Sequence, residues 1–280
     1  MRTGLVQLSV SDDPALNMPL TLALVREAAA EGAGFVLTPE CTNILSSNRI
    51  WQGQVLQTEP EDATLAALRA EAAALKIWLL IGSLGLKTAD ADGRFANRSF
   101  LIAPDGSVAA RYDKIHMFDV DVTPAESFRE SAAYRPGGAA VLAKTSFATL
   151  GLSVCYDVRF AALYRRLAQA GAEVLTVPAA FNHITGAAHW EVLLRARAIE
   201  TGCYLLAPAQ CGTHAAPNAA AGSVPRRTYG HSMVISPWGE VLADGGAEPG
   251  VIYADIDLAE VAKARARIPS LRHDRPFEGP

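Results

Sequence analysis

Long apolar runs and basic clusters are both missing from this chain of 280 residues. No stretch reaches the roughly 18 apolar residues that a membrane-spanning helix needs, and the apolar run in MRTGLVQLSV is too short for a signal peptide. The net charge is −4, and no group of basic residues is interleaved with aromatic ones. We therefore expect a cytoplasmic protein that binds neither nucleic acid nor membrane.

The motifs that hold cofactors are also missing. The sequence contains no HExxH, no P-loop and no GxGxxG, and GSLG at 82–85 is too short to stand for the last of these. The spacing of the four cysteines, Cys41, Cys155, Cys203 and Cys211, suits neither a zinc site nor a set of disulfides. We predict no metal, no cofactor and reduced thiols.

Hydrophobic residues make up 50% of the chain, enough to bury a large core, and we expect one domain over residues 1–280. Short apolar runs alternate with helical patterns, and this order occurs twice. The expected strands are residues 4–10, 34–40, 77–84, 147–154, 173–181 and 203–210, the expected helices about 18–31, 61–75, 160–170 and 188–201, and the expected hairpins 99–114 and 232–246. This alternation predicts an α/β fold with two sheets packed face to face and helices outside.

Two segments between these elements read as loops. Residues 116–136 are polar, and the Ala-rich residues 214–224 suit a surface insertion. The role of the whole loop 214–227 is left open by its composition.

Cys155 lies in GLSVCYDVRF, where an apolar run ends at a thiol and polar residues follow. Asp157 and Arg159 read as the first turn of a helix, so the cysteine is expected at a strand-to-helix junction. Backbone N–H groups and the positive end of a helix favour a thiolate there. The alternative is a small, inert core residue, which is the usual role of a free cysteine.

Three expected strands end at a polar residue: Glu40, Lys114 and Cys155. Each charge alone is explained by solvation at a strand end. Together they supply the groups of thiol acyl transfer, with Glu40 as base and then acid. Lys114 and a backbone N–H after the cysteine would stabilise the oxyanion. Because Lys114 lowers and Glu40 raises the pKa of the thiol, the ionisation of the resting sulfur is left open.

The chain resembles the nitrilase superfamily of carbon–nitrogen hydrolases over nearly its full length. The matching blocks are LTPE at 37–40, YDKIHMFDVDV at 112–122, GLSVCYDVRF at 151–160 and HWEVLLRARAIE at 189–200. The resemblance implies a four-layer α-β-β-α sandwich carrying the Glu40, Lys114 and Cys155 triad without metal or cofactor. It also implies a second active-site glutamate in a Glu-Ser pair, for which Glu130 fits the spacing better than Glu126.

CYD followed by RF is similar to the branch that contains deaminated-glutathione amidase and omega-amidase, whereas true nitrilases usually have tryptophan where this chain has Tyr156. The segments AQCG and YGHSM look more like the first of these two amidases. The resemblance implies a short amide substrate whose far end carries a carboxylate. Deaminated glutathione is the substrate expected first, and alpha-ketoglutaramate is the second candidate. Nitrile hydrolysis and acyl transfer to an amine are the other enzymatic readings, and a non-enzymatic scaffold is disfavoured by the intact triad.

A substrate carboxylate calls for a fixed cation, and Arg159 is the candidate because a guanidinium holds a carboxylate with two parallel hydrogen bonds. The alternative is that Arg159 pairs with Asp157 or Glu191. Asn182 and Thr185, expected in the loop after residues 173–181, and Tyr156 are the other candidate substrate-binding residues.

The alternative of a cysteine–histidine pair with His183 or His189 is disfavoured for two reasons. Glu40 and Lys114 already fill the required roles, and no histidine has a distinguishing sequence context. Finally, the resemblance implies a homodimer or higher homo-oligomer formed through helices near Phe160 and Ala188. The tail at about 266–280 would lie at a subunit interface.

Overall fold

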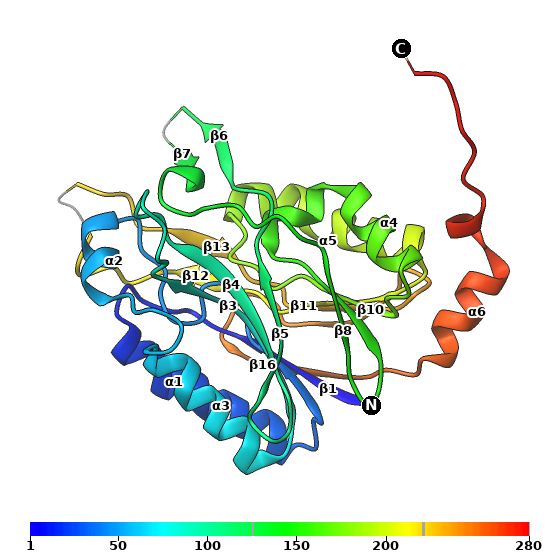
Figure 1. Cartoon of the computed structure of the whole chain (residues 1–280), viewed down its shortest axis with the longest axis horizontal. Coiled ribbons are helices and arrows are strands. Elements are labelled where there is room, and N and C mark those ends of the chain that lie inside the picture. The colour runs from blue at the N-terminus through cyan, green and yellow to red at the C-terminus, as the bar shows by residue number, and fades with distance from the viewer. Residues whose placement is uncertain (125, 220–221, 280) are drawn as a thin grey trace.

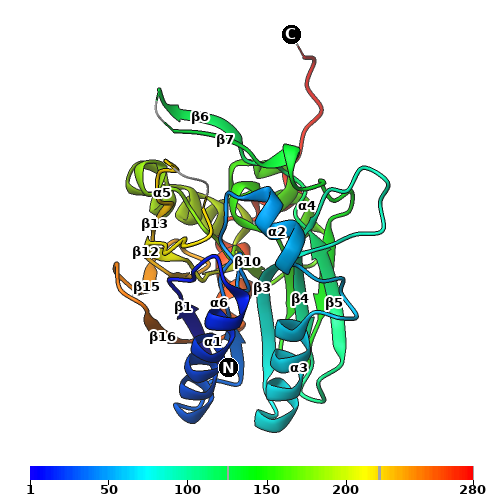
Figure 2. The same cartoon turned by 90° about the vertical axis from the view of Figure 1, so that its left-hand side faces the viewer.

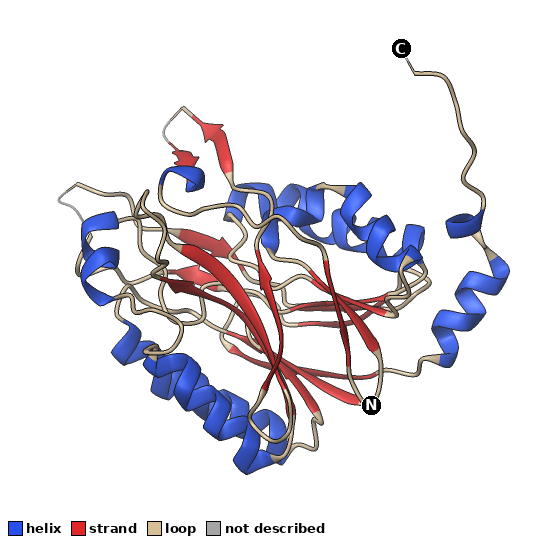
Figure 3. Cartoon of the chain, in the orientation of Figure 1, coloured by secondary structure: helices blue, strands red, loops and turns tan. Residues whose placement is uncertain are grey.

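A computed structural model describes residues 1–124, 126–219 and 222–279 of the chain. Two six-stranded sheets lie face to face (Figures 1 and 3). In order across the first sheet, the strands are β16 (Gly250–Asp255), β1 (Arg2–Gln7), β2 (Phe35–Leu37), β3 (Trp78–Leu86), β4 (Ala96–Ile102) and β5 (Val108–Asp113). In order across the second, they are β15 (Val241–Asp244), β14 (Met233–Ile235), β11 (Tyr204–Ala207), β10 (Val174–Thr176), β9 (Thr149–Leu152) and β8 (Val141–Lys144).

Helices cover the outer faces of both sheets, which gives the predicted four layers (Figure 2). The first sheet carries α1 (Pro14–Ala30) and α3 (Ala63–Leu75), and the second carries α4 (Ala161–Gln169) and α5 (His183–Thr201). The remaining helices are α2 (Arg49–Val55) and α6 (Ala259–Arg267), with short 3-10 turns at η1 (Glu130–Ala132), η2 (Cys155–Arg159) and η3 (Ser270–Arg272).

The continuous apolar runs of the sequence are strands that are buried on both faces. Leu80 packs in the core cluster that also holds Leu152 of the second sheet, whereas its neighbours Leu79 and Ile81 pack in the cluster that holds Leu68 of α3. Successive side chains of a strand point to opposite faces, so a strand between a sheet and a helix layer needs apolar residues at every position.

Strand direction brings the polar strand ends together. β1, β2 and β3 pair in parallel in one sheet, as do β9, β10 and β11 in the other. The carboxyl ends of parallel strands meet at one edge of a sheet, and Glu40 and Cys155 follow shortly after β2 and β9. Both hairpins predicted from the sequence are also present, as β4–β5 and β14–β15.

The structure differs from the sequence-based expectations in several places. Residues 116–136 contain a projecting hairpin of β6 (Asp119–Thr123) and β7 (Glu126–Arg129), not only a loop (Figure 2). The helix expected from residue 188 starts at His183, because the Asn182 side chain accepts hydrogen bonds from Ile184 N and Thr185 N and caps it. Helix α2 was not predicted.

The cysteine junction also differs in detail. Cys155 opens the 3-10 turn η2, and the α-helix starts only at Ala161, so Asp157 and Arg159 lie in the tighter turn.

The loop 214–227 closes a further hairpin, which was also not predicted and consists of β12 (Cys211–Thr213) and β13 (Arg227–Tyr229). Residues 220–221 of that loop and residue 280 of the tail lie outside the described residues. The tail extends away from the sandwich (Figure 1). Within residues 1–124, 126–219 and 222–279, no helix has the length and apolar character that crossing a bilayer would take.

Candidate active site

A cavity of about 520 Å³ opens at the edge where the polar strand ends meet. Glu40, Lys114 and Cys155 lie at its base, with exposed fractions of only 4%, 2% and 6%. The structure therefore brings together three residues that are 74 and 41 positions apart in sequence, and it withdraws the carboxylate, the ammonium group and the thiol from bulk water. In such surroundings each charge must be matched by a specific partner.

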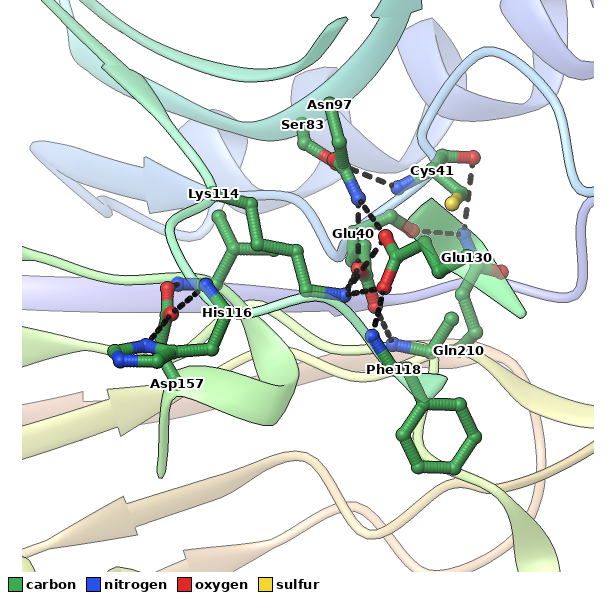
Figure 4. Close-up of polar contacts among 12 residues, drawn as sticks. Glu40, Cys41, Ser83, Asn97, Lys114, His116, Phe118, Glu130, Asp157 and Gln210 are labelled. Atoms are coloured by element: carbon green, nitrogen blue, oxygen red, sulfur yellow. Dashed lines mark hydrogen bonds and ion pairs between the residues drawn. The ribbon is translucent and has the colours of Figure 1, made fainter. Parts of the chain in front are cut away.

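The Glu40 carboxylate is held from both sides (Figure 4). Its Oε1 accepts hydrogen bonds from Lys114 Nζ at 2.9 Å and from Asn97 Nδ2 at 2.9 Å, and its Oε2 accepts one from Ala180 N at 2.8 Å. The main chain is fixed too, because Gln210 Nε2 donates to the Glu40 carbonyl oxygen at 3.0 Å. The carboxylate is thus oriented by groups from both sheets.

Lys114 is shared between two carboxylates. Its Nζ donates to both oxygens of Glu130, at 3.0 and 2.8 Å, as well as to Glu40. Glu130 is itself fixed by Phe118 N at 2.7 Å and by Asn97 Nδ2 at 3.2 Å. Of the two Glu-Ser pairs in the sequence, the one at Glu130 contacts the lysine, whereas Glu126 accepts a hydrogen bond from Asn182 Nδ2 at 2.9 Å.

Cys155 has an uncommon backbone conformation. Its φ is +50°, in the left-handed region that residues other than glycine seldom adopt. Two hydrogen bonds hold this turn in place: Cys155 N donates to Pro178 O at 2.9 Å, and Val154 N donates to Asp157 Oδ2 at 2.9 Å. Such strain occurs at functional sites where the surroundings hold the backbone in place. The Glu40 carboxylate lies close enough to this thiol to shift its pKa.

Burial decides the ionisation state of the Cys155 thiol, which the opposing charges of Glu40 and Lys114 alone left open. Burial, followed by the charge of Glu40, raises the pKa of the Cys155 thiol well above its usual value, and the opposing charge of Lys114 does not offset this. Burial would also raise the pKa of Glu40, but the charge of Lys114 and hydrogen bonds from Cys155, Lys114 and Ala180 N hold it below its usual value. At rest the site therefore holds a neutral thiol beside a carboxylate.

Burial would also lower the pKa of the Lys114 ammonium, but Glu130 and Glu40 hold it well above its usual value. The lysine therefore stays charged inside the protein. An ammonium group fixed in this way is a donor for an oxygen that becomes negative during a reaction.

The four predicted substrate-binding residues divide into two pairs. Tyr156 and Asn182 line the cavity, whereas Arg159 and Thr185 are not among its lining residues. Arg159 Nη1 lies 3.3 Å from His189 Nδ1, and its guanidinium lies over the ring of Phe181.

Neither pairing weighed for Arg159 is present in the described part of the chain, since Asp157 accepts from other groups and Glu191 pairs with Arg195. Thr185 Oγ1 donates to Asn182 O at 3.4 Å within the first turn of α5. Its hydroxyl therefore supports the helix start.

Among the cavity residues that sequence reasoning missed are Asn97 and Arg226. Asn97 lies within a strand, and a lone asparagine there carries no pattern that would have marked it. Arg226 follows the Ala-rich residues 214–224 that were interpreted as a surface insertion, in a loop (214–227) whose role the sequence left open. In the residues that the structure describes, no group of three or more His, Cys, Asp or Glu is placed to hold a metal ion.

The chain matches the carbon-nitrogen hydrolase family over residues 2–266 and belongs to it. Deaminated glutathione amidase of Synechocystis sp. is 41% identical over 261 residues, which cover 92% of each chain. Omega-amidase of Homo sapiens is 36% identical over 274 residues, covering 98% of this chain and 95% of that protein.

The crystal structure of Nit3 from Saccharomyces cerevisiae, a member of branch 10 of the nitrilase superfamily, has a TM-score of 0.82 and 26% identity, covering 98% of this chain and 96% of that one. The predicted superfamily membership and layered fold are confirmed. The chain is thus a hydrolase of carbon–nitrogen bonds other than peptide bonds.

Proposed function

We propose that this protein is an amidase that hydrolyses a short amide with a carboxylate at its far end, through a thioester on Cys155. The observation that carries the proposal is that one carboxylate, Glu40, accepts a hydrogen bond from the Lys114 ammonium and lines the same cavity as the Cys155 thiol, whose pKa it shifts. These three groups match the roles of nucleophile, proton carrier and oxyanion donor.

In the first half of the reaction, the Cys155 sulfur attacks the amide carbon while its proton moves to Glu40. The oxygen of the tetrahedral intermediate accepts hydrogen bonds from Lys114 Nζ and from a backbone N–H in the turn after the cysteine. The C–N bond then breaks, Glu40 returns the proton to the nitrogen, and ammonia leaves. Because the thiol is neutral at rest, deprotonation and attack belong to one step.

In the second half, water attacks the thioester carbon and gives a proton to Glu40. Collapse of the intermediate breaks the C–S bond, and the proton returns to the sulfur, so the acid leaves and the thiol is restored. Glu130 and Asn97 contact Lys114 and Glu40 without contacting the sulfur in the described residues, and we assign them positioning roles.

For the substrate, we propose deaminated glutathione first and alpha-ketoglutaramate second. The name of the relative from Synechocystis sp. supports the first, and the relative from Homo sapiens is named an omega-amidase, the activity for which we expect the second. A cavity of about 520 Å³ lies within the roughly 300–1,000 Å³ of small-molecule sites and leaves room for the larger of the two amides.

Ammonia release from both amides by the purified protein and by Cys155→Ala tests this proposal. We expect turnover of at least one amide by the wild type, none by the variant, and a thioester adduct on Cys155 in mass spectra of quenched reactions. No release above the Cys155→Ala level would refute the amidase assignment. Product analysis with added amines and with nitriles separates hydrolysis from acyl transfer and from nitrilase activity.

Assembly and location also belong to the proposal. We propose a cytoplasmic homodimer or higher homo-oligomer built from one domain per chain, with the tail at the interface. The family match ends at residue 266, where that tail starts, and Phe277 is 90% exposed in the tail. Light scattering of the full chain and of a chain ending at residue 266 tests this, and equal masses would contradict the role of the tail.

A further inference from the structure

The base of the loop 214–227 holds Arg226 at the wall of the cavity. His214 N donates to Arg226 O at 2.9 Å, and the next residue, Arg227, pairs with Thr213 in the β12–β13 ladder. The His214 ring adds two further contacts, since its Nδ1 lies 2.7 Å from Val10 O and its Nε2 lies 2.7 Å from Thr228 Oγ1. The backbone of Arg226 is therefore fixed at the closed end of the hairpin.

The guanidinium of Arg226 is fixed as well. Its Nη2 donates to Ala180 O at 3.1 Å, and its central carbon lies 4.5 Å from the centre of the Phe128 ring. Ala180 N, on the same residue, donates to the Glu40 carboxylate at 2.8 Å. One backbone residue thus links this cation to the proposed general base, and cation–π contact holds one face of the guanidinium against the hairpin.

The charge of Arg226 has no carboxylate partner among the described residues. Only one of the five N–H donors of its guanidinium has an acceptor there, and the buried Nε–H has none. Two charged residues of the β6–β7 hairpin also line the cavity: Arg129 pairs with Asp121 at 2.7 Å, and Glu126 accepts a hydrogen bond from Asn182. A half-buried guanidinium with unused donors in a cavity wall is suited to an anionic ligand.

We infer that Arg226 binds the carboxylate at the far end of the substrate, the role that the sequence suggested for Arg159. This inference rests on the proposed amidase function. The planar guanidinium can donate two parallel hydrogen bonds to the two oxygens of a carboxylate. Its link through Ala180 sets the distance between the carboxylate and Glu40, so that the amide end of a substrate of matching length reaches Cys155.

Two probe amides separate recognition of the charge from catalysis. Glutaramate carries an amide and a carboxylate, and in 5-methylhexanamide an isopropyl group replaces that carboxylate. For Arg226→Gln we expect kcat/KM for glutaramate to fall about 30- to 100-fold, the loss of a charge-assisted contact, while that for 5-methylhexanamide changes less than about twofold. Arg166→Gln, on the outer surface of α4, is the control and should leave both values unchanged.

Equal losses on both amides, or a selective loss in Arg159→Gln in place of Arg226→Gln, would overturn the inference. Calorimetric binding of glutarate to Cys155→Ala, with and without Arg226→Gln, gives a readout that needs no turnover. We expect the second substitution to weaken this binding by a similar factor, and unchanged binding would count against Arg226. If deaminated glutathione and alpha-ketoglutaramate release no ammonia but glutarate binding still depends on Arg226, the proposed function fails while Arg226 is still shown to bind a carboxylate.

Discussion

His116 Nδ1 lies 2.7 Å from Asp157 Oδ1, and this contact joins the turn after Lys114 to the turn of Cys155 (Figure 4). Asp157 is fully buried and also accepts hydrogen bonds from Tyr112 Oη at 2.7 Å and Val154 N at 2.9 Å. One carboxylate therefore fixes the ends of two strands that belong to opposite sheets.

Asp157→Asn should reduce both stability and turnover. An amide would turn two donor hydrogens toward groups that are themselves donors, and breaking a buried charged network costs about 3–5 kcal/mol. Urea unfolding measures the loss, and ammonia release should fall with it. Asp255→Asn is the control, because its 3.8 Å ion pair with Arg2 is solvent-exposed and worth about 0–1 kcal/mol. Equal effects of the two substitutions would contradict the bridging role of Asp157.

Gly82→Ala should displace the segment that carries Glu40. A Cβ at Gly82 would lie 2.1 Å from Thr38 O and 2.4 Å from Pro39 O, so the backbone before Glu40 would have to move. We expect a destabilisation of about 3 kcal/mol, at the upper end of overpacking effects. Gly138→Ala, which meets nothing within 4 Å, should be near neutral. Wild-type stability and turnover in Gly82→Ala would show that this close approach is not required.

Glu40→Gln should abolish turnover and yet make the sulfur more reactive toward alkylation. The charge of Glu40 is one cause of the raised pKa of Cys155, so its removal lowers that pKa and increases the thiolate fraction at a given pH. Iodoacetamide labelling at pH 8, read at Cys155 by peptide mass spectrometry, should be on the order of tenfold faster in the variant. Slower labelling would mean that Glu40 does not disfavour the thiolate.

Stability should fall with acid because of His214. Burial, aided by the charge of Arg226, lowers the pKa of His214 from 6.5 to about 4. As the pH falls, His214 is therefore protonated in the unfolded chain before it is protonated in the folded one. The neutral His214 contributes about 3 kcal/mol to the free energy of unfolding above pH 6.5, and this contribution is lost as the pH falls toward 4.

Urea unfolding between pH 7.5 and 4.5 measures this dependence. His214→Gln should be less stable at neutral pH and should show a flatter decline with acid, whereas His273→Gln, in the exposed tail, should retain the wild-type slope. A wild-type slope in His214→Gln would assign the acid sensitivity to other groups.

The sequence was sufficient for the layers, the two hairpins and the three strand-ending residues, because each depends on local polarity and strand periodicity. The roles of Asn97 and Arg226 depend on contacts between segments that are far apart in sequence. Asn97 points from its strand toward Glu40 and Glu130. Arg226 lines the cavity only because the hairpin that carries it packs there, and local sequence does not determine that packing. The ionisation of Cys155 could not be predicted because burial, which no motif encodes, outweighs the neighbouring charges.

Glu40 follows a strand of the first sheet and Cys155 follows a strand of the second. Neither half of the polypeptide therefore contains a complete active site. A fragment ending before β8 would hold the acid and the ammonium without the sulfur, and the complementary fragment the sulfur alone. Regained activity during refolding therefore reports the docking of the two sheets, a late and long-range event, and should lag behind the return of helical circular dichroism.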